Sequence, residues 1–114
     1  MSSSRLTLNL IEGSVAFSFS PEAARELQTA LMQLLDSLKV TVTKAPGSRA
    51  TPQKSMEYQH RGEVFLEIFC NPNIWPSPFA AKVLVTLQDE HIRLTTEAEL
   101  SRLVEDINQY LEQS

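Results

Sequence analysis

Residue types that could do chemistry are few in this chain of 114 residues, which has two histidines and one cysteine. His60 and His91 lack the i, i+4 spacing that places two imidazoles on one helix face for a metal ion, so each is interpreted as a solvated turn histidine. Cys70 has no second cysteine to pair with, and its sequence neighbours do not guarantee the base and electropositive setting that a nucleophilic thiol needs. We expect Cys70 to act as a small apolar side chain.

The carboxylates and glycines do not indicate an active site either. Glu63 and Glu67 share one side of a predicted strand but are not nearest same-face neighbours, and paired carboxylates do acid–base work only in unequal environments. Gly13, Gly47 and Gly62 are scattered, so no phosphate-binding loop is predicted. We therefore expect no enzymatic activity, no catalytic residue, no metal site and no cofactor.

The first third of the chain is predicted to form a hairpin followed by a helix. Leucines alternate with polar residues over 6–10, and apolar residues alternate again over 15–19, which predicts two strands joined by a turn at 11–14. Ser20 and Pro21 then have the types of an N-cap and a first helical residue. The helix is predicted to run to about Leu38.

The middle of the chain is expected to hold a flexible segment and further strands. Residues 40–43, VTVT, could form a short strand, and 44–55 have the composition of a flexible loop. Residues 56–70 are interpreted as one strand, or as a hairpin that turns near Arg61 and Gly62.

The last third is predicted to hold a second hairpin and a helix. The hairpin turns around Asp89 and Glu90. Thr96 and Glu99 have the spacing of a capping box, which predicts that the second helix begins there. The predicted fold is a single α+β domain over 1–114, in the order ββα, three to five strands, α, with an antiparallel sheet and two amphipathic helices on one of its faces.

A sheet with helices on one face does not need apolar side chains on the other. Alternation places Val64, Leu66, Ile68 and Cys70 on one side, which leaves bulky apolar residues opposite. We expect these to be covered, because a large exposed apolar patch marks an interface. The cover would be the loop at 70–79 or a second subunit in a two-fold dimer. The candidate interface residues are Phe65, Phe69, Ile74, Trp75, Phe79 and Leu84.

The segment CNPNIWPSPF, residues 70–79, holds the only tryptophan and three of the six prolines. Prolines fix φ and remove backbone donors, so this segment cannot continue a sheet strand and is stiffened. We predict that Trp75 and Phe79 are buried against the chain's own sheet or at a subunit interface, rather than exposed as a recognition surface.

The charge distribution leaves a second interpretation open. The formal net charge is −4, which disfavours a dedicated duplex-DNA binder, but no acidic residue lies between Ser37 and Met56. This basic segment is either a solvated loop or an arm for an anionic partner. In the second case single-stranded nucleic acid would stack on Tyr58, Phe65 or Trp75. The anionic-ligand candidates are Lys39, Lys44, Arg49, Lys54 and Lys82.

The stretches FSFSPEAARELQTALMQLL, EVFLEIF and AKVLVTLQDEHIRLTTEAELSRLVEDI resemble the layout of a small cyanobacterial family whose function is undefined. The resemblance covers roughly residues 15–111, although Thr95 and Thr96 stand where that family has a turn with glycine and tryptophan. It implies a fold similar to the Whirly and PC4 single-stranded-DNA-binding domains, which are often dimeric.

These observations favour one class of function over two others. The composition, 42% hydrophobic and 21% charged, is that of a globular domain, and the absence of a signal segment, a membrane span and a second cysteine indicates a cytoplasmic protein. We expect a non-enzymatic interaction module, a homodimer that binds a protein partner. The alternative is a single-stranded nucleic-acid-binding protein, and an enzyme is the least supported class.

Overall fold

The computed structural model describes residues 5–42 and 53–113. It confirms the predicted α+β class and the order ββα-ββββ-α. In chain order the elements are β1 (Arg5–Leu10), β2 (Gly13–Ser18), α1 (Pro21–Val42), β3 (Met56–Arg61), β4 (Phe65–Cys70), the 3₁₀ turn η1 (Pro72–Ile74), β5 (Lys82–Gln88), β6 (Arg93–Glu99) and α2 (Leu100–Gln113).

The strands form two antiparallel sheets. One is the β1–β2 hairpin, and the other has four strands in the order β3-β4-β5-β6, so each strand pairs with its neighbour in sequence. Residues 56–70 are thus a hairpin rather than one strand, with its turn after Arg61, which is one of the two predicted possibilities. Neither helix of the described chain is both long enough and apolar enough to cross a membrane.

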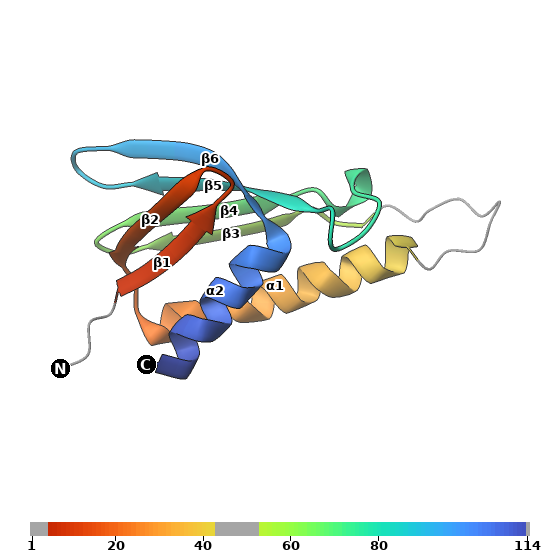
Figure 1. Cartoon of the computed structure of the whole chain (residues 1–114), viewed down its shortest axis with the longest axis horizontal. Coiled ribbons are helices and arrows are strands. Elements are labelled where there is room, and N and C mark those ends of the chain that lie inside the picture. Colours follow the sequence, from red (N-terminus) through yellow and green to blue (C-terminus); the bar gives the residue numbers. More distant parts are fainter. Residues whose placement is uncertain (1–4, 43–52, 114) are drawn as a thin grey trace.

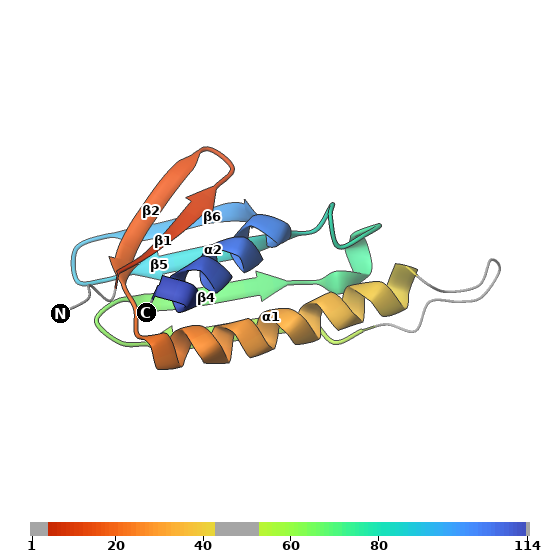
Figure 2. The same cartoon turned by 60° about the horizontal axis from the view of Figure 1, so that its bottom comes forward.

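The molecule has two layers (Figures 1 and 2). The four-stranded sheet is one layer, and α1, α2 and the β1–β2 hairpin lie side by side on one of its faces. Helix α1 contacts β3, α2 lies between α1 and β1, and the hairpin contacts β6. The prediction that both helices share one face is confirmed, and the hairpin shares that face with them.

The core lies between these layers, and strand alternation decides which side chains reach it. On β4 the buried residues are Leu66, Ile68 and Cys70, and on β5 they include Val83 and Val85. The hairpin adds Leu6, Leu8 and Phe17, and the residue after it, Phe19, is buried as well. The predicted inward side of the strand that ends at Cys70 is therefore confirmed.

Helix α1 begins as predicted. The Ser20 hydroxyl oxygen accepts a hydrogen bond from the Ala23 backbone N–H at 3.1 Å, which satisfies one of the unpaired amides of the first turn. The helix ends later than predicted, because 40–42 continue it to Val42 instead of forming a strand. Once a helix has begun, each added residue contributes one hydrogen bond, and β-branched residues cost only a fraction of a kcal/mol. Residues 43–52, most of the predicted loop, lie outside the described residues.

Helix α2 does not begin with the predicted capping box. Strand β6 continues to Glu99, which pairs with Lys82 of β5, so Thr96 lies inside a strand and cannot cap a helix. The helix starts directly at Leu100, whose backbone N–H donates to the Ala81 carbonyl at 3.0 Å. Pairing with β5 and this contact replace the local cap.

Candidate functional site

The face of the four-stranded sheet that points away from the helices carries no other element of the described chain (Figures 1 and 2). We call it the open face. Its side chains are those that alternate with the buried ones along each strand, and the strand pairing arranges them in rows across the sheet. The open face comprises Glu57, Gln59, Arg61, Phe65, Glu67, Phe69, Lys82, Leu84, Thr86, Gln88, Arg93, Thr95, Glu97 and Glu99.

Large apolar side chains lie in the middle strands of the open face. Phe69 and Leu84 are direct cross-strand partners in β4 and β5, and they remain 37% and 42% exposed. Phe65 is half-buried, and the Arg61 guanidinium lies over its ring, 5.0 Å from the ring centroid. Three predicted interface residues, Phe65, Phe69 and Leu84, are thus brought onto one surface.

Charged side chains flank these apolar residues with opposite sign at the two ends of the strands. The row that we call the basic row carries a positive charge on each outer strand and consists of Arg61, Phe65, Gln88 and Arg93. The row that we call the acidic row carries a negative charge on each outer strand and consists of Glu57, Phe69, Leu84 and Glu97. One row separates them, so the open face is polarised along the strands.

The row between them, which we call the middle row, is held by side-chain hydrogen bonds. Gln59 Nε2 donates to Glu67 at 2.7 Å, and the Thr86 and Thr95 hydroxyls lie 3.5 Å apart. Thr86 is buried although it points to the open face, because its neighbours cover it. The face therefore has little freedom to rearrange at its centre.

The proline-rich loop does not cover the open face. Phe79 lies on the helix side, where it lines a hollow of about 300 Å³ together with residues of both helices, among them Leu35 and Val104. Phe79 is 85% exposed and Ile74 66% exposed, so the prediction that Phe79 is buried against the chain's own sheet is wrong. The loop places Phe79 beside the helices, and Phe69 and Leu84 on the open face stay exposed.

Trp75, by contrast, is half-buried and packs against the core. Its side chain also hydrogen-bonds to Cys70. Burial raises the pKa of the Cys70 thiol to about 11, and the Trp75 hydrogen bond only partly opposes this rise. A neutral, buried thiol is a poor nucleophile, which agrees with the apolar role expected for Cys70.

The predicted nucleic-acid contacts do not converge among the described residues. Lys39 lines the hollow beside Phe79, Lys54 lies between α1 and β3, and Lys82 belongs to the open face. Lys44 and Arg49 lie outside the described residues. Tyr58 cannot stack on a base, because it is buried and its hydroxyl donates to the Ala23 carbonyl at 3.2 Å; burial and the nearby Glu26 raise its pKa to about 12.

The titratable residues considered in the sequence are also separated. His60 is not a solvated turn histidine: it is half-buried within β3 and packs edge-on against Phe19, with ring centroids 5.0 Å apart. His91 is exposed in the β5–β6 turn. The same turn is shaped by Asp89, whose pKa is lowered by hydrogen bonds from two backbone N–H groups. Among the described residues, no group of three or more His, Cys, Asp or Glu side chains could hold a metal ion.

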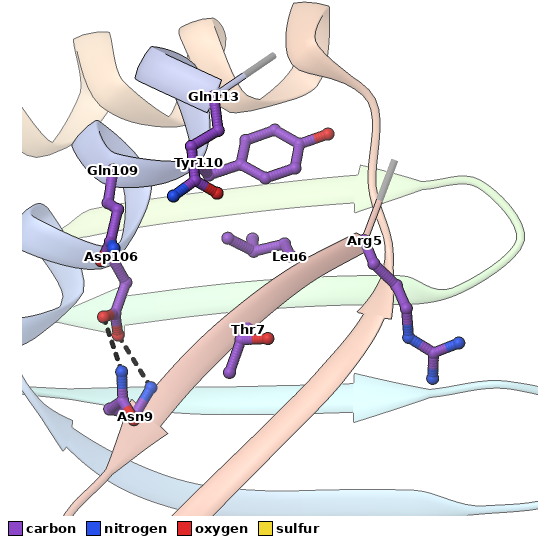
Figure 3. A pocket seen from close by; sticks show the side chains of 8 residues that line it. All are labelled: Arg5, Leu6, Thr7, Asn9, Asp106, Gln109, Tyr110 and Gln113. Atoms are coloured by element: carbon purple, nitrogen blue, oxygen red, sulfur yellow. Dashed lines mark hydrogen bonds between the residues drawn. The ribbon is translucent and has the colours of Figure 1, made fainter. Parts of the chain in front are cut away.

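A second hollow, of about 260 Å³, lies between β1 and α2 (Figure 3). Asp106 is buried there and accepts two hydrogen bonds from Asn9, from the backbone N–H at 2.7 Å and from Nδ2 at 2.8 Å. Arg102 Nε lies 3.9 Å from the same carboxylate. Asp106 thus joins α2 to the edge of β1 that pairs with no strand. The sequence carries no local signal of this contact, because the partners are 97 residues apart.

Comparison with protein-family models, with curated proteins and with solved structures finds no match to this chain. The resemblance to Whirly and PC4 domains therefore stays a prediction. The function must be inferred from the chain's own geometry.

Proposed function

We propose that this chain is a non-enzymatic interaction module that binds another protein chain through the open face. The observation that carries the proposal is the cross-strand pair of Phe69 and Leu84, exposed by 37% and 42% on a sheet face with no other described element over it. Contiguous exposed apolar side chains of this kind mark interaction sites on globular proteins.

The surroundings of this pair have the composition of a protein interface. Apolar side chains lie on the two central strands, on either side of the polar pair of Glu67 and Thr86. Charged residues such as Arg61, Glu57 and Glu97 occupy the outer strands. Apolar side chains bordered by charged ones are the usual anatomy of such interfaces. Covering them is favourable by about 25 cal/mol for each Å² of apolar surface removed from water.

The charges of the open face favour a protein partner over nucleic acid. Acidic residues occur on three of its four strands, namely Glu57, Glu67, Glu97 and Glu99. They would repel phosphates, and binding to nucleic acid depends on lysine and arginine that neutralise those phosphates. The described lysines that could do so lie on separate surfaces.

The test is a photo-crosslinking residue at Leu84, such as benzoylphenylalanine, which keeps the position apolar. Irradiation of the variant in an extract of the cells that produce the protein should yield a covalent adduct with a protein chain. A matched variant at Ala16, which is exposed on the β1–β2 hairpin, should yield none. If position 84 gives no more adduct than position 16, the proposal is wrong.

The exposed apolar side chains of the proline-rich loop form a second candidate surface. A companion experiment tests whether the partner binds there or on the open face. The adduct at position 84 should persist when the exposed Phe79 is changed to Ser, because that side chain lies on the helix side. It should decrease when Phe69 is changed to Lys, which puts a charge directly beside position 84. The reverse pattern would assign the interaction to the loop instead.

A further inference from the structure

The charged rows toward the two ends of the open face are arranged so that they complement each other. The basic row and the acidic row lie at equal distances from the middle row, on opposite sides of it. In both rows the charged residues stand on the outer strands β3 and β6, and the apolar residues stand on β4 or β5. A half-turn about an axis along the middle row therefore superposes each row on the other.

We propose that the partner on the open face is a second copy of this chain, packed face to face with its strands antiparallel to those of the first. This inference rests on the proposed function and names its partner. The two-fold axis lies along the middle row, so each basic row covers the partner's acidic row. Dimers with such an axis are the commonest oligomers of soluble proteins.

The contacts of this arrangement follow from the strand register. Arg61 on β3 lies over the partner's Glu57, and Arg93 on β6 lies over the partner's Glu97. Phe65 lies over the partner's Phe69, so the aromatic residues of β4 cover each other. Two packed sheets are rotated by about 30°, which offsets the side chains but keeps opposite rows together.

Charge decides between this arrangement and its alternative. A two-fold axis parallel to the strands would bring the basic row over the partner's basic row, with Arg61 against the partner's Arg93. The acidic rows would meet likewise, with Glu57 against the partner's Glu97. Like charges in contact at an interface are strongly unfavourable. The parallel axis makes four such contacts, whereas the antiparallel arrangement makes one, between the two copies of Glu67 at the axis, so the antiparallel arrangement is selected.

The interface is expected to be reversible. Strands of six or seven residues make the face roughly 20 Å long, and four strands make it roughly 19 Å wide. This footprint of roughly 400 Å² in projection is small beside the roughly 800 Å² of accessible surface that a standard interface buries on each partner. Glu67 also meets the partner's Glu67 at the axis, although Gln59 donates a hydrogen bond to it. The dimer should therefore dissociate on dilution.

Complementary charge reversals test the arrangement. Arg61→Glu/Arg93→Glu makes both ends of the face acidic, and Glu57→Arg/Glu97→Arg makes both ends basic. Each variant alone should dimerise at least about tenfold more weakly than the wild type in sedimentation equilibrium. An equimolar mixture should form a heterodimer with wild-type strength, which also shows that both variants are folded. A mixture that stays monomeric while the wild type dimerises would overturn the arrangement.

Disulfide formation between introduced cysteines under mild oxidation tests how the two chains are oriented in the dimer. Arg93→Cys mixed with Glu97→Cys should give a disulfide-linked heterodimer, and neither variant alone should be crosslinked; Cys70 is buried and does not compete.

Failure of this inference is distinguishable from failure of the proposed function. If the chain is monomeric but position 84 crosslinks to a different protein, the proposal of a dimer is wrong, and the proposal that the open face binds another protein is supported. If position 84 gives no adduct in the extract and none in the purified chain at high concentration, both are wrong.

Discussion

At the scale of single residues, Asp106 shows how one side chain joins parts that the sequence separates widely. Its carboxylate accepts hydrogen bonds from both the backbone N–H and the side-chain amide of Asn9, and it is buried between β1 and α2. The backbone group lies on the edge of β1 that does not pair with β2, so it depends on this acceptor. A buried donor without an acceptor costs about 1–3 kcal/mol.

Asp106→Ala should therefore lower the free energy of unfolding by about 2 kcal/mol, because it leaves the Asn9 donors without their acceptor. The measurement is urea denaturation followed by circular dichroism. Glu105→Ala, at the exposed neighbouring position of the same helix, is the control and should change stability by less than about 0.5 kcal/mol. Equal effects of the two substitutions would show that the contact does not hold the hairpin.

At the scale of elements, the two helices differ in whether a local capping signal decides where the helix begins. The signal decides the start of α1 but not that of α2. Ser20 and Pro21 follow a strand that has ended, so the Ser20 hydroxyl is free to cap α1. Thr96 and Glu99 carry an equally good capping pattern, but β6 pairs with β5 as far as Glu99. Tertiary pairing outweighs the local preference there.

Ser20→Ala should lower the free energy of unfolding by about 1 kcal/mol, because the Ala23 N–H loses its acceptor. Glu99→Ala should change it by less than about 0.5 kcal/mol, because no capping box is lost. Thermal or urea unfolding of both variants makes the comparison. A large loss for Glu99→Ala would contradict the absence of the predicted cap.

The elements and their inward faces could be predicted from the sequence, because period-two and helical alternation report which side chains are buried. The same alternation placed Phe65, Phe69 and Leu84 on the uncovered side. The rows could not be predicted. They depend on the register that sets Arg61 beside Phe65 and Gln88 beside Arg93, and that register follows from strand pairing and turn lengths. The path of the loop is likewise set by tertiary packing, so the sequence could not show that Phe79 lies beside the helices instead of against the chain's own sheet.

At the scale of the whole molecule, the layers are unequal. The described chain places α1, α2 and the hairpin on one face of the sheet and nothing on the other (Figure 2). The open face combines apolar side chains on its central strands with charged rows of opposite sign toward its two ends, which suits an antiparallel copy of itself. This asymmetry, rather than any catalytic group, is the basis of the functional interpretation.

The most direct test of this account is the mass of the purified chain in sedimentation equilibrium over a wide range of concentrations, with Leu84→Lys as the variant and Phe79→Ser as the control. We predict that the wild type and Phe79→Ser rise from the mass of one chain, 12.8 kDa, toward twice that value, while Leu84→Lys stays at one chain. A wild type that stays at the mass of one chain at every concentration, or a Leu84→Lys variant that dimerises as the wild type does, would contradict it.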